Sequence, residues 1–213
     1  MALEFGVFAP VFETAHGYLA LLGLRAPDAP ESVARVRDCC QRTHDPFPDV
    51  CRLRADANWR PHLVAAVAVI VRGYHDEAVR LLWRRLDTGS WVTPQIGVAL
   101  SMVDPEFPRG ARERLEARCP LDASDLRQMT AVERHSAAGP VGAVARSAKA
   151  AQTLLRLVRM RTPEAEWLDQ LAAAADFQAL LREDFDGSDG IADAWAQRIK
   201  AIVSADDPEA QTG

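Results

Sequence analysis

Apolar residues recur every three or four positions between residues 58 and 118, and the whole pattern occurs twice. The first unit begins at Asn58, turns at Gly73 and continues as a charged amphipathic segment to about residue 88. The second unit begins at Ser90, breaks at Asp104 and ends near Arg118. Because apolar positions with this spacing fall on one face of a helix, each unit is predicted to be a helical hairpin.

A shift of 33 positions superimposes the second unit on the first. The matching pairs are Pro61 and Pro94, Leu63 and Ile96, Ala66 and Ala99, Val67 and Leu100, Ala78 and Ala111, Leu82 and Leu115, and Arg85 and Arg118. Trp59 and Trp91 align with a shift of 32, and each follows a residue that is expected to cap a helix, Asn58 or Ser90. A proline in the first turn of each helix fits the same start signal, since its missing N–H has no helical partner to lose there.

Two-helix units that recur with a period in the thirties are typical of α-solenoids, and residues 58–118 resemble a HEAT-like repeat. The resemblance implies an all-α fold whose core is a HEAT-like α-solenoid of stacked helical hairpins, with units at about 58–88 and 90–118. Because such stacks need about three or more units to be stable, the flanking sequence is expected to supply capping helices at both ends.

The flanking sequence predicts further helices in a single all-helical domain that spans residues 1–205. These helices are expected at residues 10–22, 31–44, 50–54, 122–133, 141–160, 163–181 and 191–203. The density of proline makes residues 45–49 irregular in this prediction. Residues 206–213 are predicted to be a disordered tail.

The composition is that of an ordinary globular protein, since 48% of the 213 residues are hydrophobic and 26% are charged. The net charge of -5 argues against a general nucleic-acid binder. No run of 18 uncharged apolar residues occurs, and the first 23 residues lack the basic start of a signal peptide. We therefore expect a cytoplasmic protein without a membrane segment.

Four soft metal ligands, Cys39, Cys40, His44 and Cys51, lie within 13 positions. Cys40 and His44 stand four positions apart, which is a geometry that zinc accepts on one helix face. The spacing lacks a C-x-x-C pair, so the interpretation that we favour is reduced, half-buried cysteines without metal. A metal-dependent regulator that uses Cys40, His44 and Cys51 stays open as an alternative.

The segment from Asp184 to Ile191 is similar to the start of an EF-hand calcium loop, with acidic or hydroxyl side chains at loop positions 1, 3 and 5. The similarity ends at position 6, where Asp189 replaces glycine, and at position 12, where Trp195 replaces a bidentate acid. We interpret the segment as an acidic turn in which Ser188 or Asp189 caps the final helix.

Two further features have chemical alternatives that the pattern does not favour. The turn from Gly139 to Gly142 precedes a helix, as in phosphate sites, but no strand is expected before it and the phosphate-loop motif is absent. His75 lies beside Asp76 and Glu77, whose charges suit the first turn of a helix. The sequence therefore predicts no catalytic residue, no metal site and no cofactor.

Charge is distributed unevenly along the chain. From residue 176 onward nine acidic residues stand against three basic ones, whereas the first 175 residues have a net charge of +1. Such a segment can be plain solvated surface, or it can steer a basic protein partner. We predict that Asp184, Asp186, Asp189 and Asp193 contribute to a partner-binding surface.

The predicted function is that of a non-catalytic protein-binding scaffold. The alanine-rich and arginine-rich helical repeat resembles bacterial immunity proteins, which implies that the chain neutralises a basic toxin or effector by direct binding. The alternative is a HEAT-like enzyme that acts on nucleic acid, similar to DNA glycosylases. That alternative requires a basic and aromatic groove, and the residues expected in it are Trp59, Arg60, Arg84, Arg85 and Trp91.

Overall fold

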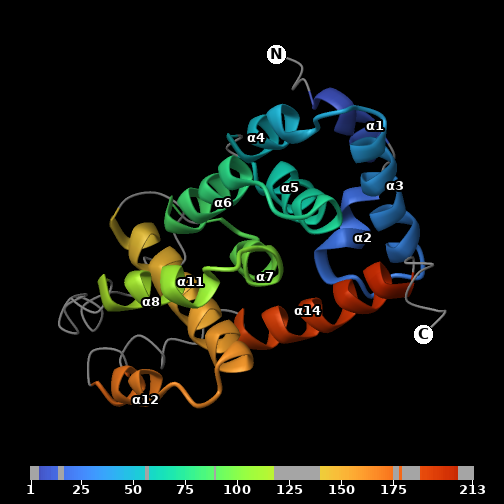
Figure 1. The fold of residues 1–213 in the computed structure, drawn as a ribbon. Coiled ribbons are helices and arrows are strands. Elements are labelled where there is room, and N and C mark those ends of the chain that lie inside the picture. The colour runs from blue at the N-terminus through green and yellow to red at the C-terminus, as the bar shows by residue number, and fades with distance from the viewer. Residues whose placement is uncertain are drawn as a thin grey trace.

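The computed structural model describes residues 5–13, 17–55, 58–88, 90–117, 140–174, 178 and 188–205. Every regular element in these residues is helical, so the all-α prediction is confirmed (Figure 1). The elements are η1 (Gly6–Phe8), α1 (Ala9–Glu13), α2 (Gly17–Gly23), α3 (Ala29–Gln41), α4 (Phe47–Ala55), α5 (Trp59–Arg72), α6 (Asp76–Thr88), α7 (Thr93–Val103), α8 (Phe107–Ala117), α11 (Pro140–Arg161), α12 (Glu166–Ala173) and α14 (Ser188–Ala205). None of the helices in the described ranges has the length and apolar character that crossing a membrane requires.

Helix α7 lies at the centre of the fold, and α5, α6, α8, α11 and α14 all pack against it (Figure 1). Every residue of α7 from Thr93 to Leu100 is buried, as is every residue of α5 from Pro61 to Ile70. Helices that are largely apolar around their whole circumference need cover on all sides. For α5 that cover comes from α2, α3, α4 and α7, whereas α11 and α14 complete the cover of α7.

The two sequence units fold as the helical pairs α5–α6 and α7–α8, and α5 packs directly on α7. Six of the seven aligned residue pairs are buried in both units, and the seventh includes Arg118, which lies outside the described residues. The overlay therefore identifies equivalent core positions. The second pair also shares its core with α11 and α14, which lie outside the repeat.

The starts of the two central helices differ. The side chain of Asn58 caps α5 as predicted, because its Oδ1 accepts a hydrogen bond from the backbone N–H of Arg60 at 3.1 Å. Ser90 does not cap α7, which begins only at Thr93. Instead, the Thr93 hydroxyl donates to the carbonyl of Ser90 at 2.6 Å and closes a turn. Trp91 lies in that turn and is 60% exposed, whereas Trp59 is half-buried in the first turn of α5.

Other helix boundaries also differ from the prediction. Helix α4 includes residues 47–49, which were predicted to be irregular, because Pro48 lies in its first turn, where a missing N–H removes no helical hydrogen bond. Helix α3 ends at Gln41, so His44 lies beyond the helix. The predicted helix at 10–22 corresponds to α1 and α2, between which residues 14–16 are not described. The predicted helix at 122–133 and the predicted tail at 206–213 lie outside the described residues.

Helices α7 and α11 approach each other closely at Gly97. A Cβ atom at this position would lie 2.6 Å from Cγ2 of Thr153 and 3.0 Å from Cδ1 of Leu157, both on α11. Thr153 is fully buried, and because it is branched at Cβ it has few alternative rotamers. The absence of a side chain at Gly97 is therefore what permits the two helices to pack at this separation.

Candidate functional site

The four acidic residues predicted as a partner surface do not form one described cluster. Asp193, on α14, accepts hydrogen bonds at Oδ2 from the guanidinium of Arg156 on α11, and the Nε to Oδ2 distance is 2.7 Å. Its side chain is 21% exposed, so the carboxylate joins two helices more than it faces solvent. Asp189 lies in the first turn of α14, and its side chain is outside the description. Asp184 and Asp186 lie outside the described residues.

The cysteines do not form a metal site in the described part of the chain. Cys40 is buried on α3, Cys51 is half-buried on α4, and His44 is not on the same helix as Cys40. Among the described residues no three His, Cys, Asp or Glu side chains lie close enough to share an ion. Burial, together with the neighbouring Cys39, raises the pKa of Cys40 to about 12, so its thiol is protonated and unreactive at neutral pH.

His75 has a structural environment at the start of α6. Its ring stacks on Phe47 with centroids 3.8 Å apart, and its Nδ1 accepts a hydrogen bond from the backbone N–H of Ala78 at 3.4 Å. Asp76 and Glu77 lie in the first turn of α6, where their charges face the positive end of the helix dipole. These contacts agree with the helix-start interpretation of this segment.

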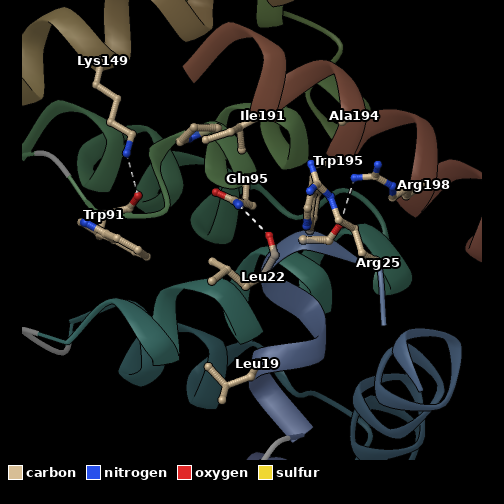
Figure 2. Close-up of a pocket in the computed structure, with 12 residues that line it drawn as sticks. Leu19, Leu22, Arg25, Trp91, Gln95, Lys149, Ile191, Ala194, Trp195 and Arg198 are labelled. Atoms are coloured by element: carbon tan, nitrogen blue, oxygen red, sulfur yellow. Dashed lines mark hydrogen bonds between the residues drawn. The ribbon is translucent and has the colours of Figure 1, made fainter. Parts of the chain in front are cut away.

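A surface pocket with a volume of about 480 Å³ lies where α2, α7, α11 and α14 meet (Figure 2). Its twelve lining residues come from segments of the chain that lie far apart in sequence. Five exposed large hydrophobic side chains occur among the described residues, and three of them line this pocket: Leu19, Trp91 and Ile191. Such a grouping of exposed apolar side chains is typical of a surface that binds another molecule.

The pocket is also positively charged. Its lining includes Arg25, Lys149 and Arg198 and contains no acidic residue. Arg198 donates from NH1 to the carbonyl of Gly23 at 3.1 Å, and Lys149 donates from Nζ to the carbonyl of Trp91 at 3.0 Å. Both acceptors are neutral carbonyls, and these two hydrogen bonds orient the cations at the pocket.

The end of α2 explains how the pocket is held together. The last carbonyls of a helix have no partner within the helix, and here they accept hydrogen bonds from side chains of α7 and α14. Trp195 donates from Nε1 to the carbonyl of Leu21 at 2.8 Å, and Gln95 donates from Nε2 to the carbonyl of Leu22 at 2.9 Å. The bond from Arg198 to Gly23 is the third of the set. The pocket wall is therefore fixed by a series of hydrogen bonds to one short helix (Figure 2).

An aromatic row continues from the pocket across the start of α5. The rings of Trp91 and Trp59 lie 5.3 Å apart between centroids, and those of Trp59 and Tyr18 lie 6.3 Å apart. The guanidinium carbon of Arg60 lies 5.0 Å from the Trp59 centroid, and its Nε donates to the Tyr18 hydroxyl at 3.1 Å. The structure thus brings together Trp59, Arg60 and Trp91, three of the five residues expected in a nucleic-acid groove.

The other two residues of that expected groove, Arg84 and Arg85, lie on α6 and do not line the pocket. Their positive charges act on Arg54 of α4, where they help to lower the pKa of its guanidinium, although burial is the larger cause. The five residues therefore do not share the pocket.

Fold and site together define the class: this is an all-helical protein with an open apolar pocket bordered by cations. A search of protein-family models found no match to the chain, and neither a curated protein nor a solved structure matched it.

Proposed function

We propose that the chain is a non-catalytic protein-binding scaffold, built on HEAT-like helical hairpins, that docks its partner at the pocket between α2, α7, α11 and α14. The observation that carries the proposal is the grouping at one pocket of Leu19, Trp91 and Ile191, three of the five exposed large hydrophobic side chains among the described residues. Tryptophan is among the residues that contribute most to protein interfaces.

The exposed area of Trp91 is large enough to contribute to the recognition of a partner. A tryptophan side chain buries about 200 Å² when fully covered, and Trp91 is 60% exposed. Covering the remaining area, about 120 Å² at roughly 25 cal/mol per Å², corresponds to about 3 kcal/mol of burial free energy, from which the cost of association is subtracted. Leu19 and Ile191 add further apolar area beside it.

The polar residues of the pocket support binding over catalysis. Gln95, Lys149 and Arg198 are each hydrogen-bonded to a backbone carbonyl. The twelve lining residues include no Ser, Thr, Cys, His, Asp or Glu, which are the side chains that most often act as nucleophiles or proton carriers. The pocket offers shape, apolar surface and positive charge, which are recognition features.

In its narrower form, the proposal is that the chain is an immunity protein, which neutralises a toxin or effector by direct binding. In that form Asp184, Asp186 and Asp189 would supply a second, acidic region that steers a basic partner. Asp193 takes less part in that region because Arg156 already binds its carboxylate.

The test begins with a partner that is isolated by affinity capture, identified and then purified. Isothermal titration calorimetry measures its Kd for the wild-type chain, for Trp91→Ala and for Ile191→Ala. We expect each variant to weaken binding at least tenfold, a change of about 1.4 kcal/mol. Met160→Ala is the matched control, because Met160 is also exposed but does not line the pocket.

Circular dichroism of each variant shows whether the fold is intact. A partner that binds Trp91→Ala and Ile191→Ala as tightly as it binds wild type would refute docking at the pocket. Equal weakening by Met160→Ala would show that the effect is not specific to this surface.

A further inference from the structure

The two arginines at the pocket have no acidic partner among the described residues. Arg25 is exposed and has no hydrogen bond or ion pair with the described residues. In the same part of the chain, the hydrogen bond to the Gly23 carbonyl is the one contact of this kind that Arg198 makes, and it occupies one nitrogen of the guanidinium. The remaining N–H groups of both guanidinium groups have no acceptor among the described residues.

Both of these side chains lie beside Gly23. A Cβ atom added to Gly23 would lie 3.8 Å from Cγ of Arg25, and the carbonyl of the same glycine accepts the hydrogen bond from Arg198. Figure 2 shows both side chains at one end of the pocket and Trp91 with Lys149 at the other. One end of the pocket therefore has two cationic side chains, although the whole chain has a net charge of -5.

Gln95 adds an independent polar feature. Its side chain is 3% exposed, and its Nε2 is held by the carbonyl of Leu22. Its Oε1 is buried and accepts no hydrogen bond from the part of the chain that the structure describes. A buried acceptor without a donor is uncommon, and this one belongs to a residue that lines the pocket.

From these observations we infer that the pocket binds an acidic, apolar segment of the partner protein. An apolar side chain enters between Leu19, Trp91 and Ile191, and a glutamate or aspartate side chain beside it pairs with Arg25 and Arg198. Arginine suits this contact because its planar guanidinium matches both oxygens of a carboxylate. The inference rests on the proposed function and names the chemistry of the partner at that same site.

The probe is a set of short peptides without tryptophan, acetylated at one end and amidated at the other. The first contains adjacent leucine and glutamate, the second replaces glutamate with glutamine, and the third replaces leucine with alanine. A fourth pairs leucine with lysine. Binding is followed by the fluorescence of the protein tryptophans, since Trp91 and Trp195 line the pocket.

We expect the leucine–glutamate peptide to bind about tenfold more tightly than its glutamine and alanine counterparts. In Arg25→Gln, and in the double variant with Arg198→Gln, the preference for glutamate over glutamine should disappear. Arg84→Gln is the matched control, because Arg84 is exposed on α6 and does not line the pocket, and it should keep the preference. Arg25→Glu should prefer the lysine peptide, which shows that the charge of this position selects the ligand.

Equal binding of the glutamate and glutamine peptides, or tighter binding of the lysine peptide to wild type, would overturn the inference. A glutamine peptide with a free terminal carboxylate that binds as tightly as the glutamate peptide would also overturn it, in favour of a chain terminus. If the charge preference is absent but the purified partner still responds to Trp91→Ala, the inference fails and the proposed function stands. If the partner also ignores Trp91→Ala, both fail.

Discussion

Gly97→Ala is expected to destabilise the protein, although alanine is the better helix former. In an open helical position this change stabilises by about 0.5–1 kcal/mol. At Gly97 the added methyl would lie 2.6 Å from Cγ2 of Thr153, about 1 Å inside the usual carbon contact of roughly 3.5–4.0 Å. Overpacking of a core costs about 1–3 kcal/mol, and the stiff, fully buried Thr153 places the cost near the upper end. The expected net loss in the free energy of unfolding is about 2 kcal/mol.

Urea unfolding followed by circular dichroism measures this loss. Gly190→Ala is the matched control, because Gly190 also lies in a helix but an added Cβ would have no atom within 4 Å. It should leave the stability unchanged or raise it by up to about 1 kcal/mol. Thr153→Ser removes the clashing methyl group, so the double variant with Gly97→Ala should recover most of the loss.

The double-mutant cycle gives the decisive number, which is the coupling energy between positions 97 and 153. We expect a coupling of about 1 kcal/mol or more, since the two groups would compete for the same space. A Gly97→Ala protein as stable as wild type, or a coupling below about 0.5 kcal/mol, would refute the close approach of α7 and α11 as the reason for glycine at this position.

Two further predictions concern buried groups. Trp83→Phe removes the 2.7 Å hydrogen bond that Nε1 donates to Oδ2 of the buried Asp104. The unpaired oxygen should lower the free energy of unfolding, measured by urea denaturation, by about 1–3 kcal/mol. A loss below about 0.5 kcal/mol would contradict this prediction. Burial raises the pKa of Cys40 from 9.0 to about 12, so the thiol of the unfolded chain ionises at a lower pH than that of the folded protein. The stability contributed by this group therefore falls as the pH rises above 9, by about 1.4 kcal/mol per pH unit. Cys40→Ala should flatten the alkaline decline relative to wild type, and parallel pH profiles for the two proteins would exclude the assignment.

The core could be predicted from the sequence because its signal is local. The apolar spacing of α5 and α7 and the cap at Asn58 each depend on residues a few positions apart, and the match between the two units appears as a constant shift of 33 positions. The cap expected at Ser90 was wrong because α7 begins only at Thr93, after the turn that Ser90 and Thr93 close. The Ser90 hydroxyl lies 2.9 Å from Nδ1 of the buried His62 and accepts from the backbone N–H of Val92. Those contacts place Trp91 in a turn and leave it exposed.

The pocket could not be predicted, because it depends on contacts between distant segments. Gln95 and Trp195 reach the end of α2 across sequence separations of 73 and 174 residues, and no periodicity reports such pairs. The same limit applies to the charge count that selected Asp193. Its partner Arg156 stands 37 positions earlier, so a count of charges along the sequence could not reveal the ion pair between the two helices. The sequence around Leu19 or Ile191 does not indicate that these apolar side chains are exposed in the folded protein.

The hydrogen bond from Trp195 to the carbonyl of Leu21 also has a consequence for synthesis on the ribosome. The two residues are 174 positions apart, so at a synthesis rate of roughly 5–20 residues per second Trp195 is added about 10–35 s after Leu21. Throughout that interval the carbonyls of Leu21 and Gly23 lack the donors that α14 provides. Products of premature termination before Trp195 therefore lack one wall of the pocket.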